Sequence, residues 1–288
     1  MRHALVVLLV ACAACSPSSN DLAEIVANAK PGQSIEVEAG TYLGPIVIDK
    51  PLTLTAAGPV VIHVAEGQIG LEIRETKDVV VSGITILGGE VGFRVWRSDD
   101  VTLLGVESEG AQRHGILVEN SHVVVRQCEV SGLTGSYPRG VEVRNSELHE
   151  ESVVEGCTVR GPVHEGIVSR LSHVRFHDNL VYDAAESGIA ITEMSAGSVT
   201  SSAVEGGSGI GILCGDMSMC DITSNRISGL EPGDERLSTL GNGVVVQYHS
   251  VATIEDLTTS GISGEAIVTS LGGTVESPGS APQPDPEG

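Results

Sequence analysis

The sequence predicts an all-β solenoid, a parallel β-helix with about 22 residues in each coil. Three observations lead to this fold class: a glycine motif that returns along the chain, a second set of positions that keeps step with it, and a composition poor in aromatic residues. Phe, Trp and Tyr make up 2% of the 288 residues, whereas Gly occurs 36 times. Such a composition suits thin, repeated layers of aliphatic residues better than a globular core built on large rings.

The glycine motif is a Gly followed by alternating apolar residues. Within each run the period is 2, which predicts strands of about three to five residues separated by turns. A final, less regular copy is Gly-Glu-Ala-Ile-Val after Ser263. The motif occurs at Gly70, Gly92, Gly115, Gly140, Gly166, Gly188, Gly209 and Gly243, with spacings of 22, 23, 25, 26, 22, 21 and 34 residues.

A second recurring position supports the same repeat. It comprises Ile84, Val106, Cys128, Cys157, Asn179, Ser202, Asn225 and Leu257. Two registers in step over eight units indicate coils that stack, with equivalent residues about 4.8 Å apart. Cys128 and Cys157 are then neighbours, either bonded or simply packed as small buried residues. Asn179 and Asn225 are expected to point inward and bind the backbone of the turn.

The first residues resemble a secretory signal. Arg2 and His3 precede an apolar run that ends at Val10 and is too short to span a bilayer. The residues up to Cys12, Leu-Val-Ala-Cys, resemble the lipobox of bacterial lipoproteins. This resemblance implies a signal peptide over 1–11, a lipid on Cys12, a tether over 12–20 and a place outside the cytoplasm; an ordinary cleaved signal is the alternative. Ala13, in place of an Asp, favours the outer membrane.

Residues 21–58 carry a second resemblance, and they read DLAEIVANAKPGQSIEVEAGTYLGPIVIDKPLTLTAAG. A short amphipathic helix, a P-G-x-x-I-x-V-x-x-G-x-Y stretch and a K-P-L-T-L strand resemble the start of right-handed parallel β-helix proteins of the pectin-lyase-like class. The resemblance implies a right-handed, single-stranded solenoid over 21–273. Leu22, Ile25 and Val26 share one face of the helix, as expected for a cap over the open end of the core. The Pro-rich residues 274–288 are expected to be a disordered tail.

Cys214 and Cys220 enclose a five-residue loop, which favours a disulfide there. A metal pair is the rival interpretation, but neither a His nor a second Cys pair lies beside it at ligand spacing. No metal site is therefore predicted. No cofactor is expected either, and calcium remains an open alternative.

The residues before the glycines form the candidate catalytic edge, because stacking places equivalent positions side by side. Arg139 should lie one strand spacing from both His114 and Glu165. The turn at 133–139, which holds Tyr137, and the turn at 231–239 are longer than their counterparts and would flank a shallow groove for an extended polymer. The candidates are His114, Tyr137, Arg139, His164, Glu165 and Glu186.

These residues would allow two carbohydrate reactions. A uronate lyase or epimerase could use His114, His164 or Tyr137 as base, with Arg139 neutralising the sugar carboxylate. A hydrolase could use Glu165 and Glu186 as its two carboxylates. However, the epimerase motif D-P-H-E, the lyase motif R-x-P-x-x-R and the Asp cluster of known enzymes of this class are missing from the sequence. The outward positions also look mostly small or apolar, as at Leu117, Val168, Ala190, Gly211 and Val245.

The favoured function is therefore a non-catalytic carbohydrate-binding or cell-surface module, with a polysaccharide or an envelope protein as its partner. Solenoids bind along their long faces. A structural scaffold or periplasmic accessory protein is the further alternative; some relatives of this fold serve copper-enzyme maturation, but the nine histidines are scattered and Met occurs only four times. The net charge of −22 argues against nucleic acid and leaves the lipid as the only membrane contact. The ligand-binding candidates are Trp96, Arg113, Arg139, Asp234 and Arg236.

Overall fold

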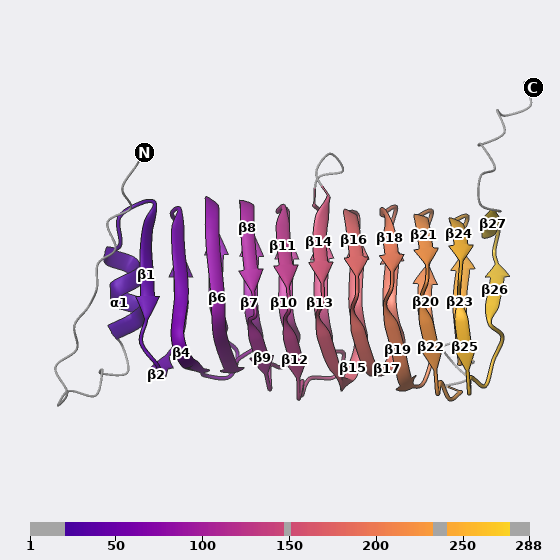
Figure 1. The fold of residues 1–288 in the computed structure, drawn as a ribbon, viewed down its shortest axis with the longest axis horizontal. Helices are drawn as coiled ribbons and strands as arrows, with labels where there is room; N and C mark the ends of the chain where they lie inside the picture. Colours follow the sequence, from indigo (N-terminus) through magenta and orange to yellow (C-terminus); the bar gives the residue numbers. More distant parts are fainter. Residues whose placement is uncertain (1–20, 147–150, 233–240, 277–288) are drawn as a thin grey trace, which may run out of the picture.

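The structure is a computed structural model that describes residues 21–146, 151–232 and 241–276. Within them the chain is a right-handed parallel β-helix of about 10 coils with about 23 residues in each. Figure 1 shows the coils as ribs along one axis, with the single short helix at one end and the last strands at the other. The predicted fold class is confirmed.

The helix α1 (Asp21–Asn28) covers the first coil. Leu22 and Val26 are fully buried against the core, whereas Ile25 is 37% exposed, so the predicted apolar face is narrower than expected. Lys50 Nζ donates to the carbonyl of Ala27 at 2.8 Å and so binds one of the free carbonyls at the C-terminal end of the helix.

Each coil contributes to three parallel sheets. The first, which we call the glycine sheet, contains the glycine motifs. Its strands are β3 (Ile46–Ile48), β5 (Ile69–Arg74), β7 (Val91–Trp96), β10 (His114–Glu119), β13 (Arg139–Arg144), the second halves of β15 (Thr158–Arg170) and β17 (Leu180–Thr192), β20 (Ile210–Cys214), β23 (Asn242–Gln247) and β26 (Ile267–Ser270).

The second sheet follows the glycine sheet across a tight turn. Its strands are β1 (Gln33–Val37), the first halves of β4 (Leu52–Val64) and β6 (Lys77–Gly88), β8 (Asp99–Leu104), β11 (Val123–Arg126), β14 (Ser152–Glu155), β16 (His173–His177), β18 (Ala196–Thr200), β21 (Met219–Thr223), β24 (Val251–Glu255) and β27 (Thr274–Glu276). The last strand extends three residues past the boundary at 273 that the sequence suggested.

The third sheet closes each coil. Its strands are β2 (Gly40–Leu43), the second halves of β4 and β6, β9 (Glu107–Glu109), β12 (Glu129–Ser131), the first halves of β15 and β17, β19 (Ala203–Gly207), β22 (Arg226–Ser228) and β25 (Thr258–Ser260). Inward Val, Ile and Leu side chains from all three sheets form one continuous core.

The motif glycines are required by close packing between coils. A Cβ on Gly140 would lie 2.5 Å from the carbonyl oxygen of Gly166 and 2.5 Å from a methyl of Val159, so no side chain fits there. The register corrects two members of the predicted set. Ile189 pairs with Ile212, which makes Gly211 rather than Gly209 the partner of Gly188. Val244 pairs with Ile267, so Ala266 rather than Gly264 is the partner of Gly243.

Polar side chains form ladders inside two of the turns. Asn179 Oδ1 accepts from the Cys157 amide at 3.0 Å, and Asn179 Nδ2 donates to Val154 O at 2.9 Å. Asn225 makes the same pair of bonds two coils later, to Ser202 N and Val199 O. The predicted inward asparagines are confirmed. The other ladder, of serines, was not anticipated; it includes Ser98, Ser121, Ser172, Ser195, Ser218 and Ser250.

Two disulfides connect the described cysteines. Cys214 bonds to Cys220, as predicted. Cys128 also bonds to Cys157 across neighbouring coils, which decides the alternative that the sequence left open in favour of a covalent link.

We predict that Asn179→Ala destabilises the solenoid by roughly 2–4 kcal/mol, because it leaves a buried amide and a buried carbonyl without partners. Chemical denaturation followed by circular dichroism measures this. Ser198→Ala, on the outward side of β18, is the matched control and should change stability by less than about 0.5 kcal/mol. Equal stability of the two variants would mean that the asparagine ladder does not support the turn.

Candidate functional site

The glycine sheet brings three of the predicted edge residues into register. His114 pairs with Arg139, and Arg139 pairs with Glu165, on consecutive coils. Arg139 Nε also forms an ion pair with Glu165. Stacking of parallel strands therefore places these residues as the spacing predicted.

Glu142 lies at the centre of this cluster, and it was not among the predicted residues. Its side chain is 1% exposed, and its Oε2 atom lies 2.7 Å from Nε2 of His114, which is 2% exposed. Its Oε1 atom forms an ion pair with Arg170 Nε at 3.2 Å. Arg139 Nη1 approaches Oε2 at 3.8 Å. Glu142 is thus a buried carboxylate with three positively charged or protonatable partners.

Arg170 extends the network to two further carboxylates. Its Nη2 atom donates to both oxygens of Glu165, at 2.8 and 2.7 Å, and its Nη1 atom pairs with Glu193 at 2.8 Å. Both oxygens of Glu165 are therefore occupied by arginine.

A second network lies on the same sheet, toward the N-terminal end. Arg94 bridges Glu72 at 3.2 Å and Glu119 at 2.7 Å, and Arg144 pairs with Glu119 at 2.6 Å. Each of these arginines contacts a glutamate on a neighbouring coil, so the ion pairs bring attraction between neighbouring strands.

The surroundings of Glu142 and Glu119 favour the ionised form of both carboxyl groups. Burial would raise the pKa of Glu142, but the hydrogen bond from His114 and the charges of His114, Arg139 and Arg144 lower it to about 2. Burial likewise opposes the lowering of the Glu119 pKa by Arg144 and Arg94. The pKa of Arg170 lies above its usual range, because Glu165, Glu193 and Glu142 outweigh its burial.

A more exposed cluster lies at the edge of the sheet. His164 Nε2 lies 2.8 Å from Glu186 Oε2, and the rings of His164 and Tyr137 are 4.9 Å apart. Tyr137 itself is largely exposed. The turn at 133–139 therefore places a tyrosine over the histidine, and these three predicted residues form one group that solvent can reach.

The remaining predicted residues lie apart from this group. Trp96 lies at the other end of its strand, with the Arg97 guanidinium 4.6 Å and the Arg94 guanidinium 5.6 Å from its ring centre. Arg113 is exposed and pairs with Glu90 at 3.1 Å. Cys12, Asp234 and Arg236 lie outside the described residues, as does most of the turn at 231–239, so the two-loop groove stays a prediction.

The outward column is apolar at Leu117 and Val168, as predicted, but charged residues occupy other positions in it. Glu72, Arg94 and Glu142 occupy the same outward column as Leu117 and Val168. The signal was present in the sequence, since each is the second residue after a motif glycine. Their mutual contacts were not readable, because alternation gives the direction of a side chain but not its rotamer.

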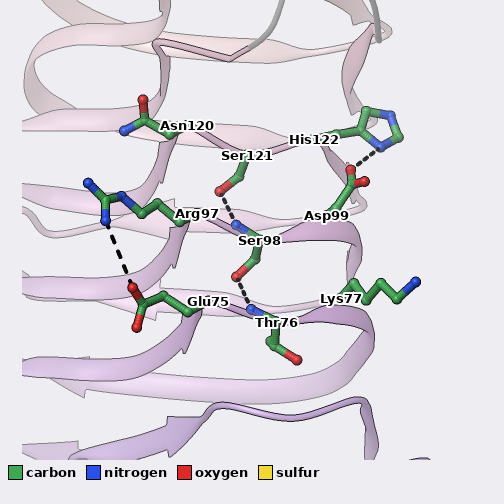
Figure 2. A pocket seen from close by; sticks show the side chains of 9 residues that line it. All are labelled: Glu75, Thr76, Lys77, Arg97, Ser98, Asp99, Asn120, Ser121 and His122. Atoms are coloured by element: carbon green, nitrogen blue, oxygen red, sulfur yellow. Dashed lines mark hydrogen bonds and ion pairs between the residues drawn. The ribbon is translucent and has the colours of Figure 1, made fainter.

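The described residues also outline a hollow on a different surface, at the turn between the glycine sheet and the second sheet. It has a volume of about 800 Å³ and is lined by Glu75, Thr76, Lys77, Arg97, Ser98, Asp99, Asn120, Ser121 and His122. Figure 2 shows Glu75, Arg97 and Asn120 on successive coils at one side and His122 turned toward Asp99 at the other. Asp99, Asp100 and His122 could together offer a cation three ligand atoms. All the acids here are exposed, and the sequence did not indicate this group.

Solved structures with the same fold include enzymes that act on carbohydrates. The alginate lyase from Paenibacillus sp. str. FPU-7 superimposes with a TM-score of 0.69 at 16% identity, over 88% of this chain and 95% of that chain. The A-module of the mannuronan C-5 epimerase AlgE4 from Azotobacter vinelandii gives 0.55 at 12%, over 88% and 94%. Pectate lyase Pel9A gives 0.50 at 14%, over 90% and 72%. Together they define the class of protein as a pectate-lyase-like right-handed parallel β-helix.

The family is given by sequence. Residues 59–231 match the family model described as periplasmic copper-binding protein (NosD). This match spans more than half of the chain, which therefore belongs to the NosD family. No curated protein matches the chain in sequence. The periplasmic description of the family agrees with the predicted location outside the cytoplasm. Within the described ranges, no helix combines the length and apolar character needed to cross a bilayer.

We predict that Glu142 makes stability depend on acid. Its pKa is lowered in the folded state to about 2 from an unfolded value near 4.5, so its stabilising contribution is complete above about pH 4.5 and is lost as pH falls toward 2. Glu142→Gln should cost about 3 kcal/mol at pH 7 and much less near pH 2. Denaturation at several pH values tests this. Glu155→Gln, an exposed member of an ion pair with Arg126, is the control and should change stability little at any pH.

Proposed function

We propose that this NosD-family chain is a non-catalytic binding module outside the cytoplasm, and that the glycine sheet and its edge contact an extended partner, a glycan or an envelope protein. The observation that carries this proposal is the pairing of the central carboxylates: Glu142, Glu165 and Glu119 are each held by arginine or histidine.

Carboxylates held in such ion pairs are poor acid or base catalysts. A glycosidase needs one carboxyl whose pKa is raised so that it can protonate the leaving group. The pKa of Glu142 is shifted in the opposite direction. Arg139, which a lyase or epimerase would need for the sugar carboxylate, already contacts Glu165 and Glu142. Lyase, epimerase and hydrolase activities remain the alternative function.

The edge cluster offers the contacts that a bound partner would use. Tyr137 presents an exposed ring beside His164, and His164 and Glu186 present polar atoms next to it. An aromatic face flanked by hydrogen-bonding groups suits a sugar ring or a polar protein surface. A lipid on Cys12, with the outer membrane as its site, would hold this face in the envelope.

Copper handling is the second candidate function, and the exposed methionines favour it beyond the family description. Met194, Met217 and Met219 are each more than half exposed on two neighbouring coils. Thioether sulfur and imidazole suit copper, and thioether in particular selects Cu(I). The donor set therefore fits copper as a cargo ion, although the number of methionines had suggested otherwise. The four described cysteines are tied up in disulfides and do not compete as ligands.

We predict that a partner glycan raises the melting temperature of the chain without being cleaved. A thermal-shift screen against a panel of polysaccharides, with product analysis of every hit, measures both. A Tyr137→Ala, His164→Ala double variant should lose the shift, and Arg126→Ala, on the second sheet, should keep it. Release of oligosaccharide or unsaturated product by the wild type would overturn the non-catalytic proposal and support the enzymatic alternative.

We also predict that the full chain binds Cu(I). Anaerobic competition with a chromophoric Cu(I) chelator, with ascorbate as reductant so that the disulfides persist, measures the stoichiometry and affinity. One Cu(I) per chain is expected. If all the copper stays on the chelator, the copper-handling function is overturned, whatever the outcome of the glycan screen.

A further inference from the structure

Exposed methionines are concentrated on one ridge of the solenoid. The chain has four Met residues, and the three that the structure describes are Met194, Met217 and Met219, which are 53%, 60% and 63% exposed. Methionine is usually buried as a flexible filler of cores. Packing in the core therefore does not explain three exposed thioethers within 26 residues of sequence.

Met194 and Met217 occupy the same turn position on consecutive coils, and His249 occupies it on the next. The amide of Met194 donates to Asp216 O at 2.8 Å, and that of Met217 donates to Tyr248 O at 2.8 Å. The amide of His249 donates to Leu271 O at 3.1 Å in the same manner. Equivalent positions of neighbouring coils are about 4.8 Å apart, so Met194, Met217 and His249 form a column about 10 Å long.

The backbone of this column is of a special kind. In earlier coils a single residue with positive φ makes the turn, such as Asn120 at 49° or Leu171 at 48°. Glu75, Arg97 and Asn120 in Figure 2 are the equivalent residues near the N-terminal end.

From residue 193 onward, two consecutive residues have positive φ, and the second is Met194 at 60°, Met217 at 60° or His249 at 59°. Two successive left-handed residues are usually Gly, Asn or Asp. Placing Met or His there strains the backbone, which makes the choice of side chain informative.

The next coil makes room for the imidazole. Gly272 continues the column, and a Cβ there would lie 2.5 Å from Nδ1 of His249. The His249 ring therefore occupies the space that a side chain at position 272 would need. The exposed ring leans toward Gly272, on the side away from Met217, so ligation with the thioethers requires it to rotate about its side-chain bonds.

We propose that Met194 Sδ, Met217 Sδ and the His249 imidazole bind one Cu(I) ion, and this rests on the copper-handling function proposed above. Two thioethers and an imidazole are neutral soft or borderline donors, a set that favours Cu(I) over the hard divalent ions. Methionine has three rotatable bonds, which lets neighbouring side chains converge on an ion between coils. Met219 lies two residues after Met217, on β21, and supplies a further thioether at the margin of the site.

The other metal-ligand group of the described residues differs in chemistry and place. Asp99, Asp100 and His122 offer two carboxylates and one imidazole, several coils toward the N-terminal end of the same ridge. Carboxylates prefer hard cations, so His122, a half-buried histidine on the same ridge, serves as an internal control for binding that does not depend on the methionines.

The test compares Cu(I) affinity, by chelator competition, and X-ray absorption at the copper edge for four full-length proteins. The wild type should bind one Cu(I) with sulfur and nitrogen neighbours. Met194→Leu with Met217→Leu should weaken Cu(I) binding more than about 100-fold and remove the sulfur signal. Loss of a residue that only orients a metal ligand already costs about 10–100-fold in affinity, and this variant loses two ligands. His249→Ala should weaken binding and remove the nitrogen signal. His122→Ala should bind like the wild type.

Methionine to leucine conserves volume and apolar character, so the double variant should melt like the wild type and report on ligation alone. Wild-type affinity and an unchanged sulfur signal in the double variant would overturn this site while leaving copper binding intact. Failure of the wild type itself to bind Cu(I) would overturn both the site and the copper function.

Discussion

Parallel hydrogen bonding between consecutive coils is the constraint on which the rest of the structure depends. Each strand pairs with the strand one coil later, in register, from β1 to β27. Equivalent residues are consequently held about 4.8 Å apart, and a chain with 2% aromatic residues can still bury a continuous core of Val, Ile and Leu. The same spacing excludes a side chain at the motif glycines, where the carbonyl of the next coil would clash.

Stacking also determines how polar residues behave. A charged column at this spacing is stable only when its members alternate in sign or are neutralised by neighbouring columns. Glu142 is neutralised in the second way, by His114 and Arg170 from neighbouring columns. The face thereby becomes rigid and saturated, which suits recognition better than proton transfer.

The turn between the glycine sheet and the second sheet forms a ridge along the solenoid, and the two ends of this ridge present different kinds of side chain. Toward the N-terminal end it presents carboxylates and a histidine around Asp99 and His122. Toward the C-terminal end it presents Met194, Met217 and His249. An interior serine ladder runs beneath both parts, although the turn is one residue longer in the C-terminal coils, and the outward residues differ between the two parts. Function on a solenoid can therefore vary along its axis without changing the fold.

The sequence by itself determined the solenoid, because the repeat of the inward residues reports directly on the stacking that buries them. It predicted the positions of Asn179 and Asn225, and the adjacency of His114, Arg139 and Glu165. It placed one motif glycine at 209 rather than 211, because the alternation Gly-Ile-Gly-Ile fits either register and only the pairing of Ile189 with Ile212 decides. It also began the last copy at Gly264, whereas the pairing puts Ala266 in that position. It overestimated the buried face of the helix at Ile25, since the cap rests on one coil only.

Tertiary structure alone decided which outward side chains meet. Glu142 and Arg170 lie 28 residues apart in sequence and on different columns, and long side chains reach across columns according to their rotamers. The methionine column could not be read from the sequence for a related reason. After the turn at Leu171, each equivalent turn has one more residue, and only the backbone hydrogen bonds show that Met194, Met217 and His249 occupy the same position. Periodicity fixes what points inward, whereas the surface obeys contacts that the repeat does not encode.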